Sequence, residues 1–119
     1  MNRAVTIPVK RVAILFLDDK DVRFEVFCHD YPDAVFVKTS SDAIQQISGK
    51  YWDMVSLDRD LENGDSGEVV VDWIASHRPS IGAIIIHSTN VPRSMSMIRK
   101  LREAGYFVRY SPIEVDLSQ

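Results

Sequence analysis

Two short apolar runs that each end abruptly in aspartate constrain the fold of this chain most strongly. Residues 12–17 are all apolar and are followed by Asp18 and Asp19. Residues 52–57 form a second, largely apolar run and are followed by Asp58. Runs of this length are typical of strands buried on both faces, which occur in parallel sheets covered by helices. We therefore expect acidic side chains at the carboxyl ends of two buried parallel strands.

Strand and helix signals alternate along the rest of the chain. Ser40 or Ser41 is a candidate N-cap for a helix that ends at Gly49, and Pro92 suits the first turn of a helix that ends near Gly105. The predicted strands are 12–17, 34–37, 52–57, 81–86 and 106–110, and the predicted helices are 21–29, 40–49, 66–77 and 92–104.

This alternation predicts a three-layer α/β/α domain of flavodoxin-like type. Strands that alternate with helices form a parallel sheet with right-handed crossovers and helices on both faces. We expect five parallel strands in the order 2-1-3-4-5. The 119 residues are the size of one domain, so we predict a single domain over 1–119 with a core of about 11–112.

Composition narrows the class of protein. The net charge of −3 does not indicate a general nucleic-acid-binding surface. Cys28 is the one cysteine, so no disulfide can form within the chain, and a reducing, cytoplasmic location is expected. No uncharged apolar run approaches the roughly 20 residues that cross a membrane, and we expect no membrane contact.

The aspartates are expected to form a metal site. In a sheet of order 2-1-3-4-5 the first and third strands flank the switch in strand order, where ligands bind outside the carboxyl ends. Asp18, Asp19 and Asp58 fall there, and close carboxylates repel unless a cation lies among them. We predict Mg²⁺ or Mn²⁺ held by these oxygens. Alternatively, Asp19 caps the following helix, and Asp58 is a carboxylate nucleophile or an Asx-turn residue.

A phosphate site is expected beside the metal. The strand 81–86 is followed by His87, Ser88, Thr89 and Asn90, where the next helix would present free N–H groups. His87 is a candidate general acid, and Ser88 and Asn90 are candidate phosphate donors. The alternatives are a half-buried histidine and two ordinary helix caps.

These positions resemble the phosphoacceptor site of response-regulator (CheY-like) receivers. Receivers have an acidic pair after the first strand, an aspartate after the third and a hydroxyl residue after the fourth. The matching residues here are Asp18 with Asp19, Asp58 and Ser88. Receivers also place a lysine at the end of the fifth strand, and residues 109–112 contain none.

The chain more closely resembles the cyclic-phosphate processing receiver domains. That family shows patterns like LDD, SLDHDL with a downstream glycine, and HSxN, and here 17–19, 56–61 with Gly64 and Gly67, and 87–90 match them. The resemblance implies a metal-assisted site for a phosphate ester, such as a cyclic phosphate of an RNA end or a nucleotide. Arg59 replaces the family's histidine, and an arginine can bind phosphate bidentately but cannot shuttle protons.

Three functions stay open on sequence alone. The first is a phosphoesterase in which Asp58 and His87 act with the metal, while Asp60 either faces the site or pairs with Arg59. The second is a receiver phosphorylated on Asp58 that signals through Ser88 and an aromatic residue, Tyr106 or Phe107. The third is an inert pseudo-receiver that binds a protein partner through the helix 92–104 and the strand 106–110.

Overall fold

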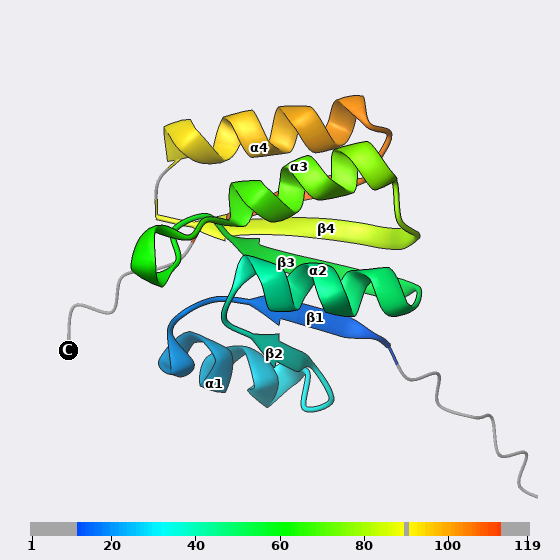
Figure 1. The fold of residues 1–119 in the computed structure, drawn as a ribbon. Helices are drawn as coiled ribbons and strands as arrows, with labels where there is room; N and C mark the ends of the chain where they lie inside the picture. The colour runs from blue at the N-terminus through cyan, green and yellow to red at the C-terminus, as the bar shows by residue number, and fades with distance from the viewer. Residues whose placement is uncertain (1–11, 90, 113–119) are drawn as a thin grey trace, which may run out of the picture.

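The computed structural model describes residues 12–89 and 91–112, which form one parallel sheet with helices on both faces. The strand order is β2-β1-β3-β4-β5, so the predicted order and the flavodoxin-like α/β fold are confirmed (Figure 1). The strands are β1 (Ile14–Leu17), β2 (Val35–Val37), β3 (Trp52–Asp58), β4 (Ile81–Ser88) and β5 (Val108–Pro112).

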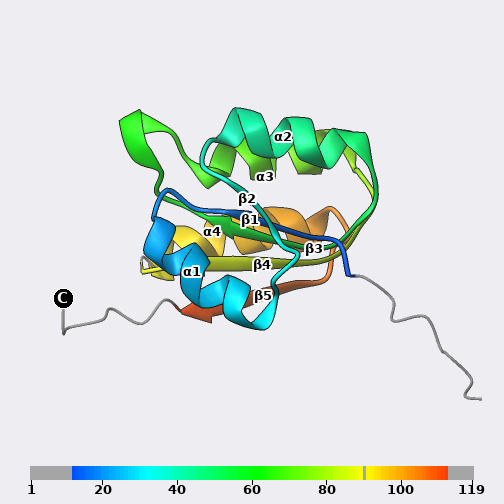
Figure 2. The same cartoon turned by 90° about the horizontal axis from the view of Figure 1, so that it is seen from below.

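The helices divide unevenly between the two faces of this sheet. Within the described residues, α1 lies on one face, and α2 and α3 lie on the other (Figure 2). The fourth helix, α4, packs against α3 and lies along β4 and β5. None of the described helices combines the length and hydrophobicity that crossing a membrane requires. The helices are α1 (Asp21–Asp30), α2 (Ser40–Gly49), α3 (Gly67–His77) and α4 (Val91–Glu103), with a 3₁₀ turn, η1 (Glu62–Gly64), before α3.

Alternate residues of the central strands face opposite layers. The register aligns Phe16 of β1 with Ser56 of β3, and Ser56 with Ile85 of β4. Phe16 stacks on Phe27 of α1, so this set faces α1. The other set joins α2 and α3 in the hydrophobic core, and its members are Leu15, Leu17, Val55, Leu57, Ile84 and Ile86.

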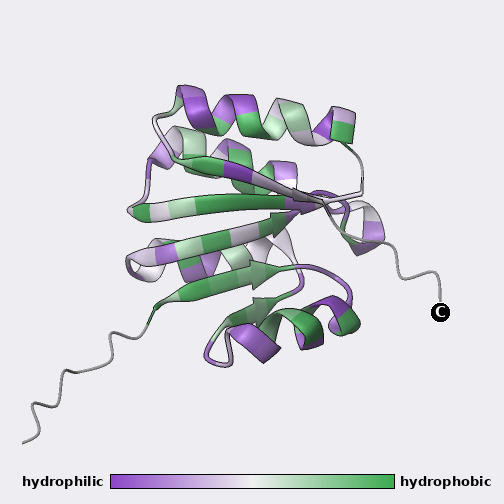
Figure 3. Cartoon of the chain, turned by 180° about the vertical axis from the view of Figure 1, so that it is seen from behind, coloured by the Kyte–Doolittle hydropathy of each residue, from purple (hydrophilic) through white to green (hydrophobic). Residues whose placement is uncertain are grey.

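Hydrophobic residues concentrate on the strands, and more polar residues follow at the carboxyl ends (Figure 3). The third and fourth strands run further than the sequence predicts, to Asp58 and Ser88. Both strands are buried there, and β3 pairs with β4 as far as Asp58 and His87. The candidate site residues therefore sit on sheet ends that are held by backbone hydrogen bonds.

The start of α2 corrects one prediction. The N-cap is Thr39, whose hydroxyl accepts a hydrogen bond from the backbone N–H of Asp42, and not Ser40 or Ser41. The Ser40 hydroxyl instead donates to Asp65 Oδ1 at 2.6 Å. A tertiary partner from the loop before α3 therefore decides which residue caps the helix.

Candidate functional site

The structure brings the three predicted carboxylates together at the carboxyl edge of the sheet. One carboxylate oxygen from each of Asp18, Asp19 and Asp58 lies within 4.8 Å of the other two. The cause is topological, because β1 and β3 are neighbours and their last paired residues are Leu17 and Leu57. Residues that directly follow this pair must meet at the same edge.

Gly67 fixes the backbone around Asp58. A Cβ atom at position 67 would lie 2.0 Å from the carbonyl oxygen of Asp58, so only glycine fits this close approach. The Gly67 N–H also donates to the carbonyl oxygen of Arg59 at 2.8 Å. The first residue of α3 is thereby packed directly against the end of β3. This packing explains why a glycine accompanies the predicted acidic motif.

Asp18 is fully buried and is the best-satisfied carboxylate of the three. Its Oδ1 accepts a hydrogen bond from the Lys20 backbone N–H at 2.9 Å, and its Oδ2 contacts His87 Nε2 at 3.0 Å. Burial is the largest influence on the pKa of Asp18 and raises it, but the hydrogen bonds with His87 and Lys20, together with the charges of His87 and Arg23, lower the net pKa. Asp18 is therefore ionised at neutral pH.

The burial of the Asp58 and Asp19 carboxylates is offset by fewer hydrogen bonds than that of Asp18. Burial, followed by the charge of Asp18, raises the pKa of Asp58 to about 7. Burial also raises the pKa of Asp19. Asp58 Oδ2 and Asp19 Oδ1 are buried without a hydrogen-bond partner among the described residues. Buried oxygens without partners are costly, and a cation would satisfy them.

His87 joins Asp18 to the interior of the sheet. Its Nδ1 lies 2.7 Å from Ser56 Oγ, and its ring stacks on Phe16 with centroids 4.6 Å apart. Because the Asp18 carboxylate only accepts hydrogen bonds, Nε2 carries the hydrogen, and in the neutral ring the Ser56 hydroxyl donates to Nδ1. His87 is 5% exposed, so both ring nitrogens face protein groups. Sequence reasoning missed Ser56, although its position two residues before Asp58 places it on the same face of β3.

Arg59 and Asp60 contact each other. The Arg59 guanidinium pairs with Asp60 through Nη1, and its Nε donates to Glu68 Oε1 at 3.1 Å. Asp60 is therefore engaged by Arg59, one of the two arrangements considered from the sequence. The predicted contact of Arg59 with phosphate stays a prediction.

The candidate residues at the end of β4 and just beyond it are described only in part. Ser88 is buried, and its carbonyl oxygen accepts a hydrogen bond from the Tyr110 hydroxyl at 2.7 Å. Asn90 lies outside the described residues. Tyr106 donates its hydroxyl to the carbonyl oxygen of Pro79, whereas Phe107 is 65% exposed. The predicted roles of these residues stay predictions.

Arg23 is a site residue that sequence reasoning missed. It lies in α1, and its Nη1 donates hydrogen bonds of 3.5 Å to both carboxylate oxygens of Asp18. The same nitrogen forms an ion pair with Asp58 Oδ2, also at 3.5 Å. Its position in the first turn of the helix that follows Asp19 was the available signal, since such residues lie near the carboxyl end of the preceding strand.

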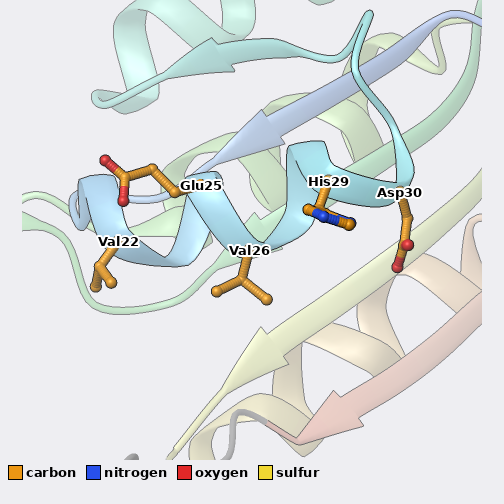
Figure 4. Close-up of a pocket in the computed structure, with 5 residues that line it drawn as sticks. All are labelled: Val22, Glu25, Val26, His29 and Asp30. Atoms are coloured by element: carbon orange, nitrogen blue, oxygen red, sulfur yellow. The ribbon is translucent and has the colours of Figure 1, made fainter.

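A separate hollow lies along α1 and contains none of the predicted site residues. It is lined by Val22, Glu25, Val26, His29 and Asp30 (Figure 4). Two exposed valines and charged groups form this surface, without the convergent carboxylates found at the sheet edge.

A family model described as the cyclic-phosphate processing receiver domain matches residues 13–103. The chain belongs to this family. The matched region includes the segments 17–19, 56–61 and 87–90 that carry the resemblance in the sequence. No curated protein matches the chain.

The chain is also similar to solved receiver domains. The signal receiver domain of a putative Luxo repressor protein from Vibrio parahaemolyticus is 25% identical, with a TM-score of 0.68, over 90% of this chain and 82% of that one. The response regulator domain of Thermotoga maritima CheB is 18% identical, with a TM-score of 0.67, over 92% and 85%. A response regulator protein from Burkholderia pseudomallei, solved with a phosphorylated aspartic acid, a calcium ion and citrate, is 15% identical, with a TM-score of 0.65, over 90% and 62%. The receiver fold is therefore well supported.

Proposed function

We propose that this receiver domain binds a divalent cation, Mg²⁺ or Mn²⁺, through Asp18, Asp19 and Asp58. We further propose that it binds or processes a phosphate ester beside the cation, with a cyclic phosphate of an RNA end or a nucleotide as the expected ligand. The observation that carries this proposal is the convergence of three largely buried carboxylates within 4.8 Å. The family's description supports the class of ligand.

The carboxylates fit a hard divalent cation. Such ions take oxygen ligands, and among the described residues Asp19 and Asp58 each keep one buried oxygen that accepts no hydrogen bond. These carboxylates belong to neighbouring strand ends and lie within 4.8 Å of each other. When bound, the cation would supply charge stabilisation to a phosphoryl oxygen. A cation would also hold Asp58 ionised, because it offsets the burial and the repulsion that raise the pKa of this carboxyl.

His87 is placed to hold Asp18. Its contacts with Asp18 and Ser56 support an orienting role, since a buried ring with both nitrogens engaged fixes the rotation of the carboxylate that it contacts. Proton transfer by His87 stays a prediction and requires that the contact with Asp18 open when the ligand binds. Ser88, at the end of β4, is a proposed phosphate donor. Asn90 is proposed from the sequence alone, because it lies outside the described residues.

Thermal unfolding tests the proposal directly. A ligand that binds only the folded protein stabilises it and raises the melting temperature. At a ligand concentration of 100 times Kd the added free energy of unfolding is about 2.7 kcal/mol. We expect a rise with millimolar Mg²⁺ or Mn²⁺ and a further rise with a 2′,3′-cyclic nucleotide. The substitution Asp19→Asn should reduce the metal effect.

The matched control is Asp72→Asn, which removes an exposed carboxylate on α3 that pairs with Lys100. This variant should keep the full response to metal. A wild-type protein that shows no metal-dependent rise would contradict the proposal and would favour the pseudo-receiver that binds a protein partner through α4 and β5.

A second candidate function is phosphorylation of Asp58. The observation that favours it is the buried Oδ2 atom of Asp58, which lies beside two other aspartates and accepts no hydrogen bond from the described residues. Incubation with acetyl phosphate and Mg²⁺ should then add one phosphoryl group, seen by mass spectrometry, with acetate as the leaving group. Asp58→Asn should abolish the added mass, and labelling that survives this substitution would exclude Asp58 as the acceptor.

A further inference from the structure

The cluster of carboxylates contains an internal cation that belongs to the chain itself. Arg23 Nη1 lies 3.5 Å from each carboxylate oxygen of Asp18 and also 3.5 Å from Asp58 Oδ2. These two aspartates come from different strands, so the guanidinium bridges the ends of β1 and β3. A positive charge between two carboxylates is attracted by both.

We propose that Arg23 is the charge-balancing and phosphate-recognising residue of this site. In the metal-free protein its guanidinium is the counter-ion of Asp18 and Asp58. When a divalent cation takes over these carboxylates, the guanidinium is released to contact the phosphate group of the ligand. The inference rests on the proposed metal and phosphate site and adds the residue that couples its two halves.

The contacts of Arg23 are loose enough for exchange. Charge-assisted hydrogen bonds between guanidinium and carboxylate are usually about 2.7–2.9 Å long, whereas both distances here are 3.5 Å. The side chain is also 30% exposed, unlike the fully buried side chain of Asp18. The guanidinium can therefore leave the carboxylates without leaving the mouth of the site.

Metal and guanidinium compete for the same oxygens. A cation held by Asp18 and Asp58 would lie close to Arg23, and two positive charges at such a distance repel. Arg23 should therefore weaken the binding of a metal ion alone. A dianionic phosphate group reverses this effect, because it is attracted by both positive charges.

The other arginine beside the site is engaged elsewhere. Arg59 is held by Glu68 and Asp60, on the side of β3 that leads to α3. Arg23 contacts the metal-binding carboxylates directly. Its planar fork of donors suits phosphate better than a point charge does.

The test compares two affinities of the full chain. Binding of Mn²⁺ alone is measured by calorimetry, and binding of inorganic phosphate is then measured at saturating Mn²⁺. We expect Arg23→Gln to bind Mn²⁺ several-fold more tightly than the wild type and phosphate about tenfold more weakly. A merely structural loss would weaken both.

Two further variants isolate the role of the guanidinium. Lys20→Gln removes a positive charge that lies 4.0 Å from Asp19 Oδ2 and is 52% exposed, and it should change either affinity by less than about twofold. Arg23→Lys keeps the charge but not the fork, so it should bind Mn²⁺ like the wild type and phosphate more weakly.

The outcomes separate this inference from the proposed function. If the wild type binds Mn²⁺ and phosphate and Arg23→Gln changes neither affinity, the role of Arg23 is wrong while the proposed site stands. If the wild type binds no Mn²⁺, the proposed site is wrong. The counter-ion role is then tested by urea unfolding of the metal-free Arg23→Gln variant, the Asp58→Asn variant and the double variant. A counter-ion role predicts that the changes in the free energy of unfolding are not additive, and additive changes would overturn it. If the wild type binds Mn²⁺ but no phosphate, the phosphate contact is overturned in both proposals.

Discussion

The face of the sheet that α2 and α3 cover and the face that α1 covers are built from alternate residues of the same strands. On the first, β3 contributes Val55 and Leu57, and both are fully buried in aliphatic surroundings. On the second, β3 contributes Ser56 and Asp58, which are nearly as buried but contact His87 and Arg23. Equal burial therefore accompanies very different chemistry.

The difference shows that aliphatic packing stabilises one face of the sheet, whereas buried carboxylates lower the stability of the other. Aliphatic packing on the first face supplies apolar burial without polar groups to satisfy. On the second face the ring of His87 stacks on Phe16. Beyond it, Asp58 and Asp19 each have one buried oxygen without a hydrogen-bond partner among the described residues. Perturbed carboxylates of this kind concentrate at functional sites.

Leu57→Ala should give the largest effect. Removing a fully buried leucine side chain leaves a cavity, and we expect a loss of about 2–5 kcal/mol in the free energy of unfolding. Urea denaturation of the metal-free protein measures this loss. A loss below about 1 kcal/mol would break the comparison, because the aliphatic face would then not be the main source of stability.

Asp58→Asn should change how stability depends on pH. The pKa of Asp58 is about 7 in the folded protein, above its ordinary value of 3.8, so the unfolded chain releases this proton first as pH rises. In the wild type the contribution of Asp58 to the free energy of unfolding therefore falls by up to about 4 kcal/mol as pH rises from about 4 to about 7. Above pH 7 this contribution stays constant. Unfolding of both proteins in chelator from pH 4 to 8 checks this. The variant should be the more stable at pH 8, and parallel curves would contradict the raised pKa.

Ser56→Ala should give a smaller effect that sharpens the contrast with its neighbour Leu57. The substitution leaves His87 Nδ1 buried without its present partner, at a cost of about 1 kcal/mol. The same urea titration measures it, with Ser48→Ala as the control, because the Ser48 hydroxyl donates an exposed hydrogen bond to the carbonyl oxygen of Gln45. An effect as large as that of Leu57→Ala would mean that the polar face is as important for stability as the aliphatic one.

The sequence alone was sufficient to predict the sheet and the meeting of the three aspartates. Apolar runs mark buried strands, and an acid directly after such a run must lie at the carboxyl edge. The order 2-1-3-4-5 then makes β1 and β3 neighbours, and the structure has Asp18, Asp19 and Asp58 within 4.8 Å. The family resemblance rested on the same positions, and the match over residues 13–103 bears it out.

Other parts of the site depended on contacts between distant segments. Ser56 and His87 are 31 positions apart, and they meet because β3 and β4 pair in a register that no local pattern reveals. Arg59 turns to Glu68 because Gly67 brings the start of α3 against the end of β3. The cap of α2 likewise moved to Thr39 because Asp65 engages Ser40.

What the sequence by itself determined is the type and order of the strands and helices and the edge at which the acids gather, because periodicity and strand endings are local properties of the chain. What only the tertiary structure decided is the pairing of each charge: His87 with Asp18, Arg23 with Asp18 and Asp58, and Arg59 with Asp60 and Glu68. The physical reason is that a long or buried side chain takes its partner from sheet register and helix placement, which are set by the packing of the whole domain.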